Sequence, residues 1–392
     1  MFNPPSIGKC CGCMACQNVC LVNAIGVKTD KLGFHYPYIT NNGKCINCDR
    51  CNRVCIAKIE VQTQKDVGAV LAGYSTDFEI RKCSSSGGIF PVLCKYVLDH
   101  KGVCYGVGFN TSFDTEHIRI NRIEDLHTIC TSKYTESSLS NVFRMVKKDL
   151  DQGIMVLFSG TPCQSRGLRS FLPRNYDNLL LIDLFCYGIP SPVVWRKWLG
   201  TISQGKKPVF VNFRDKEEGW EKYSLRIVYS DGTEYRKNKT EDLFLKTFTK
   251  GGYLRQSCYE CAYKGFPRVS DITLGDFQEI LELDPSVDTK MGWSMIKINT
   301  DKGQKTLDAV KDNLFVNIVE AEQMNSLHPN IGTPVAIHPN RRFIAAHIND
   351  YEIESLLIHK AGITLGMKFR NHIFRTINKF KTFTSSQLKE KS

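Results

Sequence analysis

The chain has 392 residues, of which 42% are hydrophobic, and it carries a formal net charge of +12. This length and composition predict an ordinary globular protein of two or three domains with a sizeable core. Its 17 cysteines come with neither a secretory signal at the start nor an apolar run of roughly 18 residues, which excludes a small secreted disulfide scaffold and a membrane span; we expect reduced thiols in a cytoplasmic protein.

Two four-cysteine runs with one spacing, C-x2-C-x2-C-x3-C, open the chain. The first run holds Cys10, Cys13, Cys16 and Cys20, and the second holds Cys45, Cys48, Cys51 and Cys55. In this spacing three thiolates bind one 4Fe-4S cluster and the fourth cysteine completes the cluster of the other run. We therefore assign one cluster to the first three cysteines of the first run with Cys55. The other cluster takes the first three of the second run with Cys20.

Zinc and disulfides are the alternatives for these thiols. Structural zinc usually takes its ligands as two separated pairs, whereas each run here crowds three thiols into one short stretch. Leu21 and Ile56 stand where such runs usually have proline, which loosens a turn but removes no ligand. Cys11 is a spare thiol beside Cys10, and the even spacing favours Cys10 as the ligand.

The cysteine runs lie in a predicted N-terminal domain, residues 1–64, with short strands at 24–27 and 34–37. Its helical segments are too short to fold alone. We expect a ferredoxin-like domain that its two clusters hold together, because metal binding supplies folding free energy in such small modules.

A mixed α/β pattern follows, which we divide into residues 65–150 and 151–340 of one larger domain. Apolar runs predict buried strands, and helical periodicity predicts helices at 89–97 and 142–150. Asp231-Gly232 predicts a hairpin turn. The predicted strands are 67–74, 102–108, 154–158, 179–184, 272–274 and 294–298.

A turn of small residues, Ser84, Ser85, Ser86, Gly87 and Gly88, precedes the helix at 89–97. Free N–H groups at the start of a helix bind phosphate well. A serine N-cap, with glycine for the bend, explains the same composition. Both readings stay open at this point.

Four further cysteines, Cys163, Cys186, Cys258 and Cys261, are expected to bind a third 4Fe-4S cluster. The first two follow apolar strands directly, and in open α/β sheets ligands bind at the carboxyl ends of strands. A redox dithiol and unrelated buried thiols are the alternatives. Three basic residues near the C-x2-C pair would offset the charge of such a cluster: Arg255, Lys264 and Arg268.

Residues 341–392 are predicted to form a helical, basic C-terminal extension. From residue 367 onward seven basic residues accompany one acid, Glu390, and apolar residues recur beside them at helical spacing. We expect a helix docked on the body; peripheral contact with a membrane surface is the alternative, and nucleic-acid binding is not expected.

Several motifs follow one another in a specific order. They are SSSGGIF at 84–90, SKY at 132–134, FSGTPCQ at 158–164, DLFCYGIPSP at 183–192, FRDK at 213–216, GW at 219–220, LRQSC at 254–258, SDITLGDF at 270–277 and GWS at 292–294. The series resembles the coenzyme F420 hydrogenase/dehydrogenase beta-subunit family, in its bacterial branch with an N-terminal two-cluster ferredoxin. Tyr187 and Gln278 stand where that family commonly has histidine and tryptophan.

The resemblance implies a flavin, FAD or FMN, and a 4Fe-4S cluster in the main body. With the turn described above, it gives these candidate flavin contacts: Ser85, Ser86, Gly87, Gly88, Lys133 and Thr161. Clusters pass single electrons while hydride chemistry moves two, and a flavin does both.

We therefore predict an iron-sulfur flavoprotein oxidoreductase that passes electrons between a ferredoxin-like partner protein and a small organic acceptor. Related bacterial proteins occur beside surface-polysaccharide functions. The alternatives are an electron-relay subunit without a substrate site, a deazaflavin coenzyme F420 reductase or dehydrogenase, and an iron-sulfur protein that binds nucleic acid.

Other side chains have two readings each. Asp271 and Asp276 act as acid or base, or cap the turns of a buried strand. Lys133 and Arg214 hold an anion, or lie on solvated surface. The remaining body cysteines have no paired spacing and are expected to be buried small hydrophobic residues: Cys83, Cys94, Cys104 and Cys130.

Overall fold

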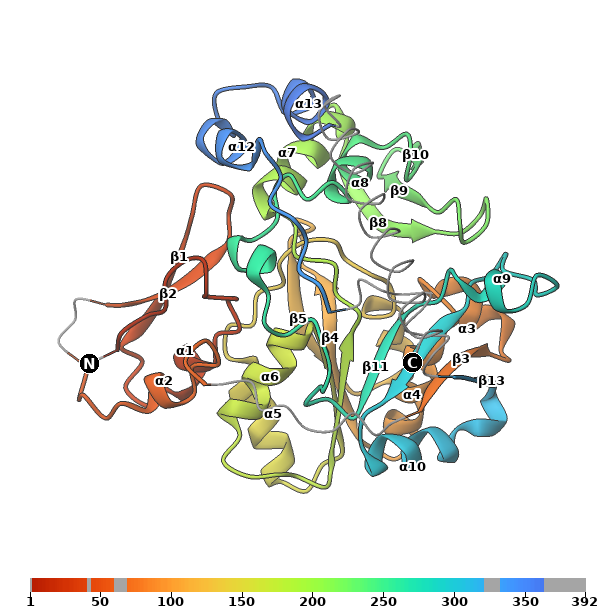
Figure 1. Cartoon of the computed structure of the whole chain (residues 1–392), viewed down its shortest axis with the longest axis horizontal. Helices are drawn as coiled ribbons and strands as arrows, with labels where there is room; N and C mark the ends of the chain where they lie inside the picture. Colours follow the sequence, from red (N-terminus) through yellow and green to blue (C-terminus); the bar gives the residue numbers. More distant parts are fainter. Residues whose placement is uncertain (1, 41–43, 60–68, 321–331, 363–392) are drawn as a thin grey trace, which may run out of the picture.

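The computed structural model describes residues 2–40, 44–59, 69–320 and 332–362. An N-terminal module (residues 2–59) lies at one end of the long axis, beside a body built on a large central sheet (Figure 1). Above that sheet in the same view, a smaller sheet and several helices form a second unit.

The N-terminal module is a hairpin with two short helices. Strands β1 (Ile25–Thr29) and β2 (His35–Ile39) pair antiparallel, which agrees with the two strands predicted here. Helix α1 (Ala15–Val19) follows the first cysteines of the first run, and α2 (Arg50–Arg53) lies within the second run. With so little regular structure, the module depends on its contacts with the body and on whatever its cysteines bind.

The central sheet has eight strands in the order β13-β3-β12-β11-β7-β6-β4-β5. Strands β4, β6, β7 and β11 pair in parallel, and β3 runs in the same direction because β12 pairs antiparallel with both β11 and β3. The mixed α/β class is therefore confirmed. The bounds are β3 Val70–Ser75, β4 Val103–Phe109, β5 Thr115–Ile120, β6 Val156–Gly160, β7 Leu179–Leu184, β11 Ile272–Asp276, β12 Ser294–Ile298 and β13 Leu314–Val319.

Helices cover both faces of this sheet. On one face, α4 (Ile89–Asp99) buries the predicted apolar stripe of Ile89, Leu93 and Val97 in a core that also includes residues of α10 (Asp301–Ala309). On the other face, α5 (Val142–Asp151) and α6 (Pro162–Phe171) pack together with Met14 and Ala15 of the N-terminal module. The module therefore completes a core of the body.

The second unit has a core of its own, built around Trp195, Phe213 and Phe244. The hairpin predicted at Asp231-Gly232 joins two of its three antiparallel strands, and Gly232 has the positive φ of 81° that such a turn needs. Its elements are β8 Pro208–Asp215, β9 Ser224–Tyr229, β10 Glu234–Asn238, α7 Pro192–Ser203, α8 Leu243–Phe248, α12 Arg341–His347 and α13 Ile353–Leu356.

Short elements complete the described chain, and the basic part of the predicted C-terminal extension (363–392) lies outside it. In the ranges that the structure describes, no helix is both long and apolar enough to cross a membrane. The short elements are α3 Phe78–Cys83, α9 Ile280–Leu283, the 3-10 helices Ile123–Thr128, Gln256–Glu260 and Lys311–Asn313, and a π-helical turn at Leu357–Ala361.

Candidate functional site

The carboxyl edge of the central sheet collects the loops that follow β3, β4, β6, β7 and β11. Strands β6 and β7 are parallel neighbours, with Gly160 opposite Asp183, so the loops that follow them leave the sheet side by side. Cys163 lies in the first turn of α6, directly after β6, and Cys186 follows β7. The neighbouring strands expected from the sequence therefore exist.

The structure brings together the body cysteine set, which we define as Cys163, Cys186, Cys258 and Cys261. Burial raises the pKa of Cys186, and its thiol also lies within electrostatic range of the other three. Burial likewise raises the pKa of Cys258 to about 12. Polar groups lie close to these sulfurs: the Thr161 hydroxyl lies 3.2 Å from Cys163 Sγ, and the Ile189 N–H donates to Cys258 Sγ at 3.4 Å.

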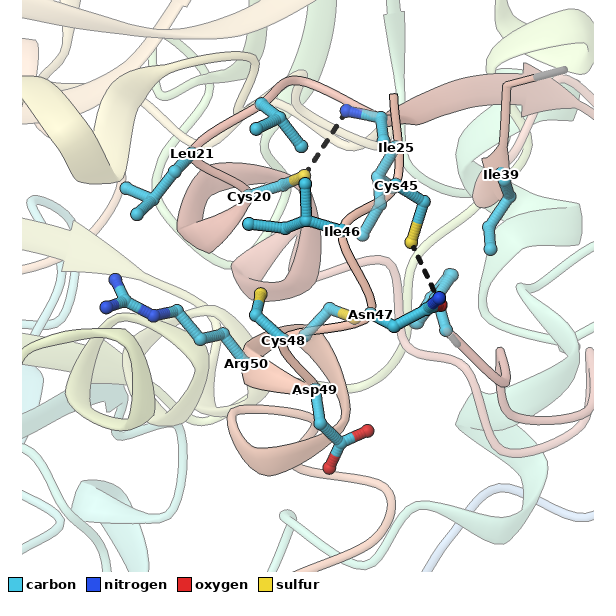
Figure 2. A pocket seen from close by; sticks show the side chains of 14 residues that line it. Cys20, Leu21, Ile25, Ile39, Cys45, Ile46, Asn47, Cys48, Asp49 and Arg50 are labelled. Carbon is cyan, nitrogen blue, oxygen red and sulfur yellow. Dashed lines mark hydrogen bonds between the residues drawn. The ribbon is translucent and has the colours of Figure 1, made fainter. Parts of the chain in front are cut away.

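The two N-terminal runs surround two separate cavities, and the fourth cysteine of each run joins the other run. The first cavity is lined by Cys10, Cys11, Cys13, Cys16 and Cys55. The second cavity is lined by Cys20, Cys45, Cys48 and Cys51, with apolar side chains such as Ile25 and Ile39 (Figure 2). This is the grouping that the spacing predicts; that clusters fill the cavities stays a prediction.

The thiols of the two N-terminal groups line the walls of these two cavities. In the part of the chain that the structure describes, no three Cys, His, Asp or Glu side chains converge closely enough to hold a single metal ion.

Cys11 lies between the first cavity and the body cysteine set. Its thiol lies close enough to those of Cys13 and Cys163 for both to affect its pKa, which is raised well above the usual value, chiefly by Cys13. Helix α6 approaches the same place, since a Cβ added at Gly167 would lie 3.0 Å from Cys13 Sγ. The first cavity and the body set are thus adjacent, although their cysteines are far apart in sequence.

Arg255 is buried against the first run, and its charge also lies within electrostatic range of Cys163 and Cys258 of the body cysteine set. Its guanidinium donates to the Cys10 carbonyl at 3.0 Å and the His35 carbonyl at 2.7 Å, and it pairs with the Glu136 carboxylate. The guanidinium lies so close to Gly12 that a side chain there would clash, because a Cβ would lie 2.8 Å from the guanidinium carbon. Arg255 therefore joins the module to the body.

The other two basic residues near the C-x2-C pair also lie close to these cysteines. Lys264 lies within electrostatic range of Cys186, Cys261 and Cys258, as expected. Arg268 lies within electrostatic range of Cys261 and forms a buried ion pair with Asp183 at 3.2 Å.

A second group of motifs meets at the same edge of the sheet. The Ser132 N–H donates to the Ser85 hydroxyl at 2.8 Å. The Arg214 guanidinium donates to the Ser85 carbonyl at 3.1 Å, to the Asp276 carboxylate at 2.6 Å and to the Tyr134 hydroxyl at 3.1 Å. Motifs that the sequence separates widely therefore form one site.

The turn at residues 84–88 is held tightly by β3 and β12. The Gly87 N–H donates to the Ser294 hydroxyl at 2.9 Å, the Ser86 hydroxyl donates to the Trp293 carbonyl at 2.7 Å, and a Cβ at Gly87 would lie 2.5 Å from the Gly73 carbonyl oxygen. The N-cap of α4 is Gly88, with no side-chain cap. The serine-cap reading is therefore wrong, and phosphate binding stays a prediction.

Three buried or half-buried basic residues line this site; we call Lys133, Arg214 and Lys216 the basic cluster. Burial lowers the pKa of Lys133 to about 7, and its ammonium donates to the Thr128 carbonyl at 2.9 Å. Burial, with a smaller effect of Arg214, lowers the pKa of Lys216 to about 7. The sequence analysis missed Lys216, although it ends the FRDK motif.

The remaining candidates have structural contacts. Asp271 accepts a hydrogen bond from the Leu181 N–H at 2.8 Å and another from the Thr300 hydroxyl at 2.7 Å, so it braces the sheet. Thr161 is the N-cap of α6. Cys94 and Cys104 are buried as expected, whereas Cys83 is exposed and Cys130 is only partly buried.

Comparison with known proteins adds a family. Residues 154–324 match the family model that describes the C terminus of the beta subunit of coenzyme F420 hydrogenase/dehydrogenase. This segment of the chain is therefore similar to the family that the series of motifs resembles. The matched range includes the whole body cysteine set, while both N-terminal runs precede it.

Relatives of the beta-subunit family share only part of the sequence. One subunit of the F(420)H(2) dehydrogenase of Methanosarcina mazei is 25% identical over 240 residues, so the chain spans 61% of that protein with 59% of its own length. Among solved structures, a chain of the F420-reducing nickel–iron hydrogenase complex from Methanosarcina barkeri aligns with a TM-score of 0.44 and 18% identity. That alignment covers 82% of this chain and 96% of the other.

Proposed function

We propose that the chain is an electron-transfer oxidoreductase subunit with two 4Fe-4S clusters in its N-terminal module, a third in its body and a flavin at the carboxyl edge of the sheet. One observation supports it most strongly. The body cysteine set, assembled from three distant segments, lies beside Cys11 and the first cavity. Three sets of thiols thus follow one another from the surface to the sheet.

The donor sets suit iron-sulfur clusters by their chemistry. Cysteine thiolates are the usual ligands of 4Fe-4S clusters, and each set offers four. Burial raises the pKa of thiols in all three sets, for example Cys16, Cys51 and Cys261. These thiols must lose protons to bind metal, so assembly of the clusters would release protons.

The basic cluster and the turn at 84–88 would hold the flavin, FAD or FMN. A flavin exchanges single electrons with clusters and two with organic substrates. The chain would bind the flavin phosphate with two cations, the partly buried Lys133 and the buried Arg214. The uncapped start of α4 adds a partial positive charge. Buried cations beside a helix start favour an anionic ligand over an empty surface.

The substrate is proposed by similarity alone. The names of the relatives make the deazaflavin coenzyme F420 one candidate acceptor or donor, and a small organic compound of surface-polysaccharide metabolism is the other. The basic cluster favours a chain with its own ligand site over a pure relay subunit.

Flavin content tests this function. Protein prepared anaerobically should release about one FAD or FMN per chain on denaturation, and dithionite should bleach its visible absorption. Lys133→Met should lose most of the flavin, because it removes a buried cation from the site. The exposed Lys246→Met serves as the matched control and should keep it. Parent protein without flavin would contradict the proposal.

A further inference from the structure

We propose that the surface around the second cavity binds an acidic one-electron carrier protein, with Leu21 and Ile46 at its centre and Arg50 and Arg53 at its rim. This inference rests on the proposed function and adds the partner and the docking surface. It depends on three observations: exposed apolar side chains over cysteines, a local excess of positive charge, and the burial of cysteines in the first cavity.

The centre of this surface is apolar and lies directly on the cysteines. Leu21 and Ile46 are 68% and 63% exposed. Both line the second cavity, and Figure 2 shows them beside Cys20, Cys45 and Cys48. Large apolar side chains exposed next to one another are typical of interaction sites. A partner that covers them would approach the thiols closely.

The rim of the surface is basic. Residues 44–59 contain four basic side chains and a single acid, Asp49. Arg50 and Arg53 are exposed, and Arg50 lies beside Cys48 in Figure 2. Such a rim attracts an acidic partner and speeds encounter at low salt. It repels a second copy of itself, so charge favours a different, acidic protein over self-association.

The thiols of the first cavity are less accessible than those of the second. In the first cavity Cys10, Cys16 and Cys55 are buried, and Arg255 and α6 of the body close on that run. In the second run Cys48 is exposed. A carrier protein therefore comes closest to the thiols at the second cavity.

The test is the rate at which a reduced, acidic plant-type ferredoxin, used as a probe, reduces the anaerobic holoprotein in stopped flow. We expect the rate to fall at least about tenfold between 50 and 200 mM salt. Arg50→Glu should lower the low-salt rate by about the same factor. Arg53→Glu is a second variant on the same rim. Lys207→Glu, an exposed charge reversal on the second unit, should leave the rate unchanged.

The controls separate this inference from the proposed function. If the parent contains no iron or is not reduced by dithionite, the proposed function fails before the carrier is tested. If iron and dithionite reduction are normal in every variant, three results overturn the docking surface. The first is a reduction rate independent of salt, and the second is an equal loss of rate in Arg50→Glu and Lys207→Glu. The third is that Arg50→Glu keeps the parent's reduction rate but loses binding to anionic phospholipid vesicles. The last result would assign the surface to a membrane.

Discussion

Arg255 joins the N-terminal module to the body through a single guanidinium group. It donates to the carbonyls of Cys10 and His35 and neutralises Glu136, which also accepts the His35 N–H at 2.9 Å. Both members of the ion pair are buried, with side-chain exposures of 1% and 7%. Removal of one charge would leave the other buried and unpaired.

Arg255→Met should therefore lower the free energy of unfolding by about 3 kcal/mol or more, as for other broken buried pairs. Urea unfolding followed by tryptophan fluorescence measures it. The double variant Arg255→Met/Glu136→Gln removes both charges and should recover part of the loss. Loss of an exposed pair, in Arg122→Met, should have no measurable effect. Equal effects of the buried and exposed variants would contradict the role of Arg255.

Cys10 and Cys11 are neighbours with different surroundings. Cys10 lies within electrostatic range of Cys55, whereas Cys11, which also lines the first cavity, is near Cys163 of the body set as well as Cys13. Cys10→Ala should therefore lose about four irons per chain, and Cys11→Ala should keep the iron content of the parent. Iron analysis of both anaerobic proteins decides. The opposite pattern would make Cys11 the ligand.

Lys133 should make stability depend on pH. Its pKa of about 7 in the folded protein lies below the value of about 10.4 of an unfolded lysine. Between these values the unfolded chain binds more protons, so this group's contribution to stability rises with pH from about 7 to about 10.

Lys133→Met should accordingly flatten the rise in the free energy of unfolding over that pH interval, relative to the parent. Urea titrations of the two proteins at several pH values measure the difference. The charge of Lys133 also lowers the pKa of the nearby Cys130, so both proteins are compared in a Cys130→Ser background, where Lys133 is the titrating group that differs. Identical slopes would mean that Lys133 titrates like an exposed lysine.

At the scale of elements, the N-terminal module has a docked side and an exposed side. Leu32 and Phe34 belong to the core of the second unit, and Arg144 of α5 donates to the carbonyls of Asn18 and Cys20 at 2.6 Å each. The second run is attached at its end, where the Ser170 hydroxyl donates to the Val54 carbonyl at 3.0 Å, while Cys48 is exposed.

Limited proteolysis should distinguish the two sides. Cys48→Ala should expose residues 44–59 to cleavage while β1 and β2 stay protected, because their contacts with the body remain. Cys13→Ala should expose the module more widely, since Cys13 lies against α6. Variants as resistant as the parent, with unchanged brown colour, would show that these cysteines are not cluster ligands.

The central strands could be predicted because they are apolar runs with turn residues at their ends; β6, β7, β11 and β12 lie within two residues of the expected positions. The second unit could not, since its core joins β8 and α8 to α12 and α13 far along the chain. The same holds for Arg255, whose partners Cys10 and Glu136 are close only in three dimensions. A local sequence pattern therefore predicts individual strands and helices, but it does not predict which distant residues pack against them.

The site divides in the same way. Spacing alone predicted which cysteines share a cavity in the N-terminal module, because both runs are local. The order of the motifs indicated the family, and the structure shows that several of these motifs meet at one site. Lys216 was indicated only by its place at the end of the FRDK motif, and the proximity of Cys11 to Cys163 had no sequence signal, since both depend on how separate loops fold against one another.

At the scale of the whole molecule, three sets of thiols and one basic site follow one another in space. They run from the exposed second cavity, through the first cavity and Cys11, to the carboxyl edge of the sheet. The arrangement suits a chain that receives electrons at one end and delivers them at the other. Such a path requires that the body cysteine set binds a cluster of its own, which is the claim to be tested.

Iron per chain in anaerobically prepared protein tests that claim most directly. The parent should contain about twelve irons, and Cys258→Ala about eight, because one 4Fe-4S cluster is lost. Cys94→Ala, which removes a buried cysteine outside the three sets, is the matched control and should keep the parent value. A parent with about eight irons, unchanged in Cys258→Ala, would contradict the third cluster.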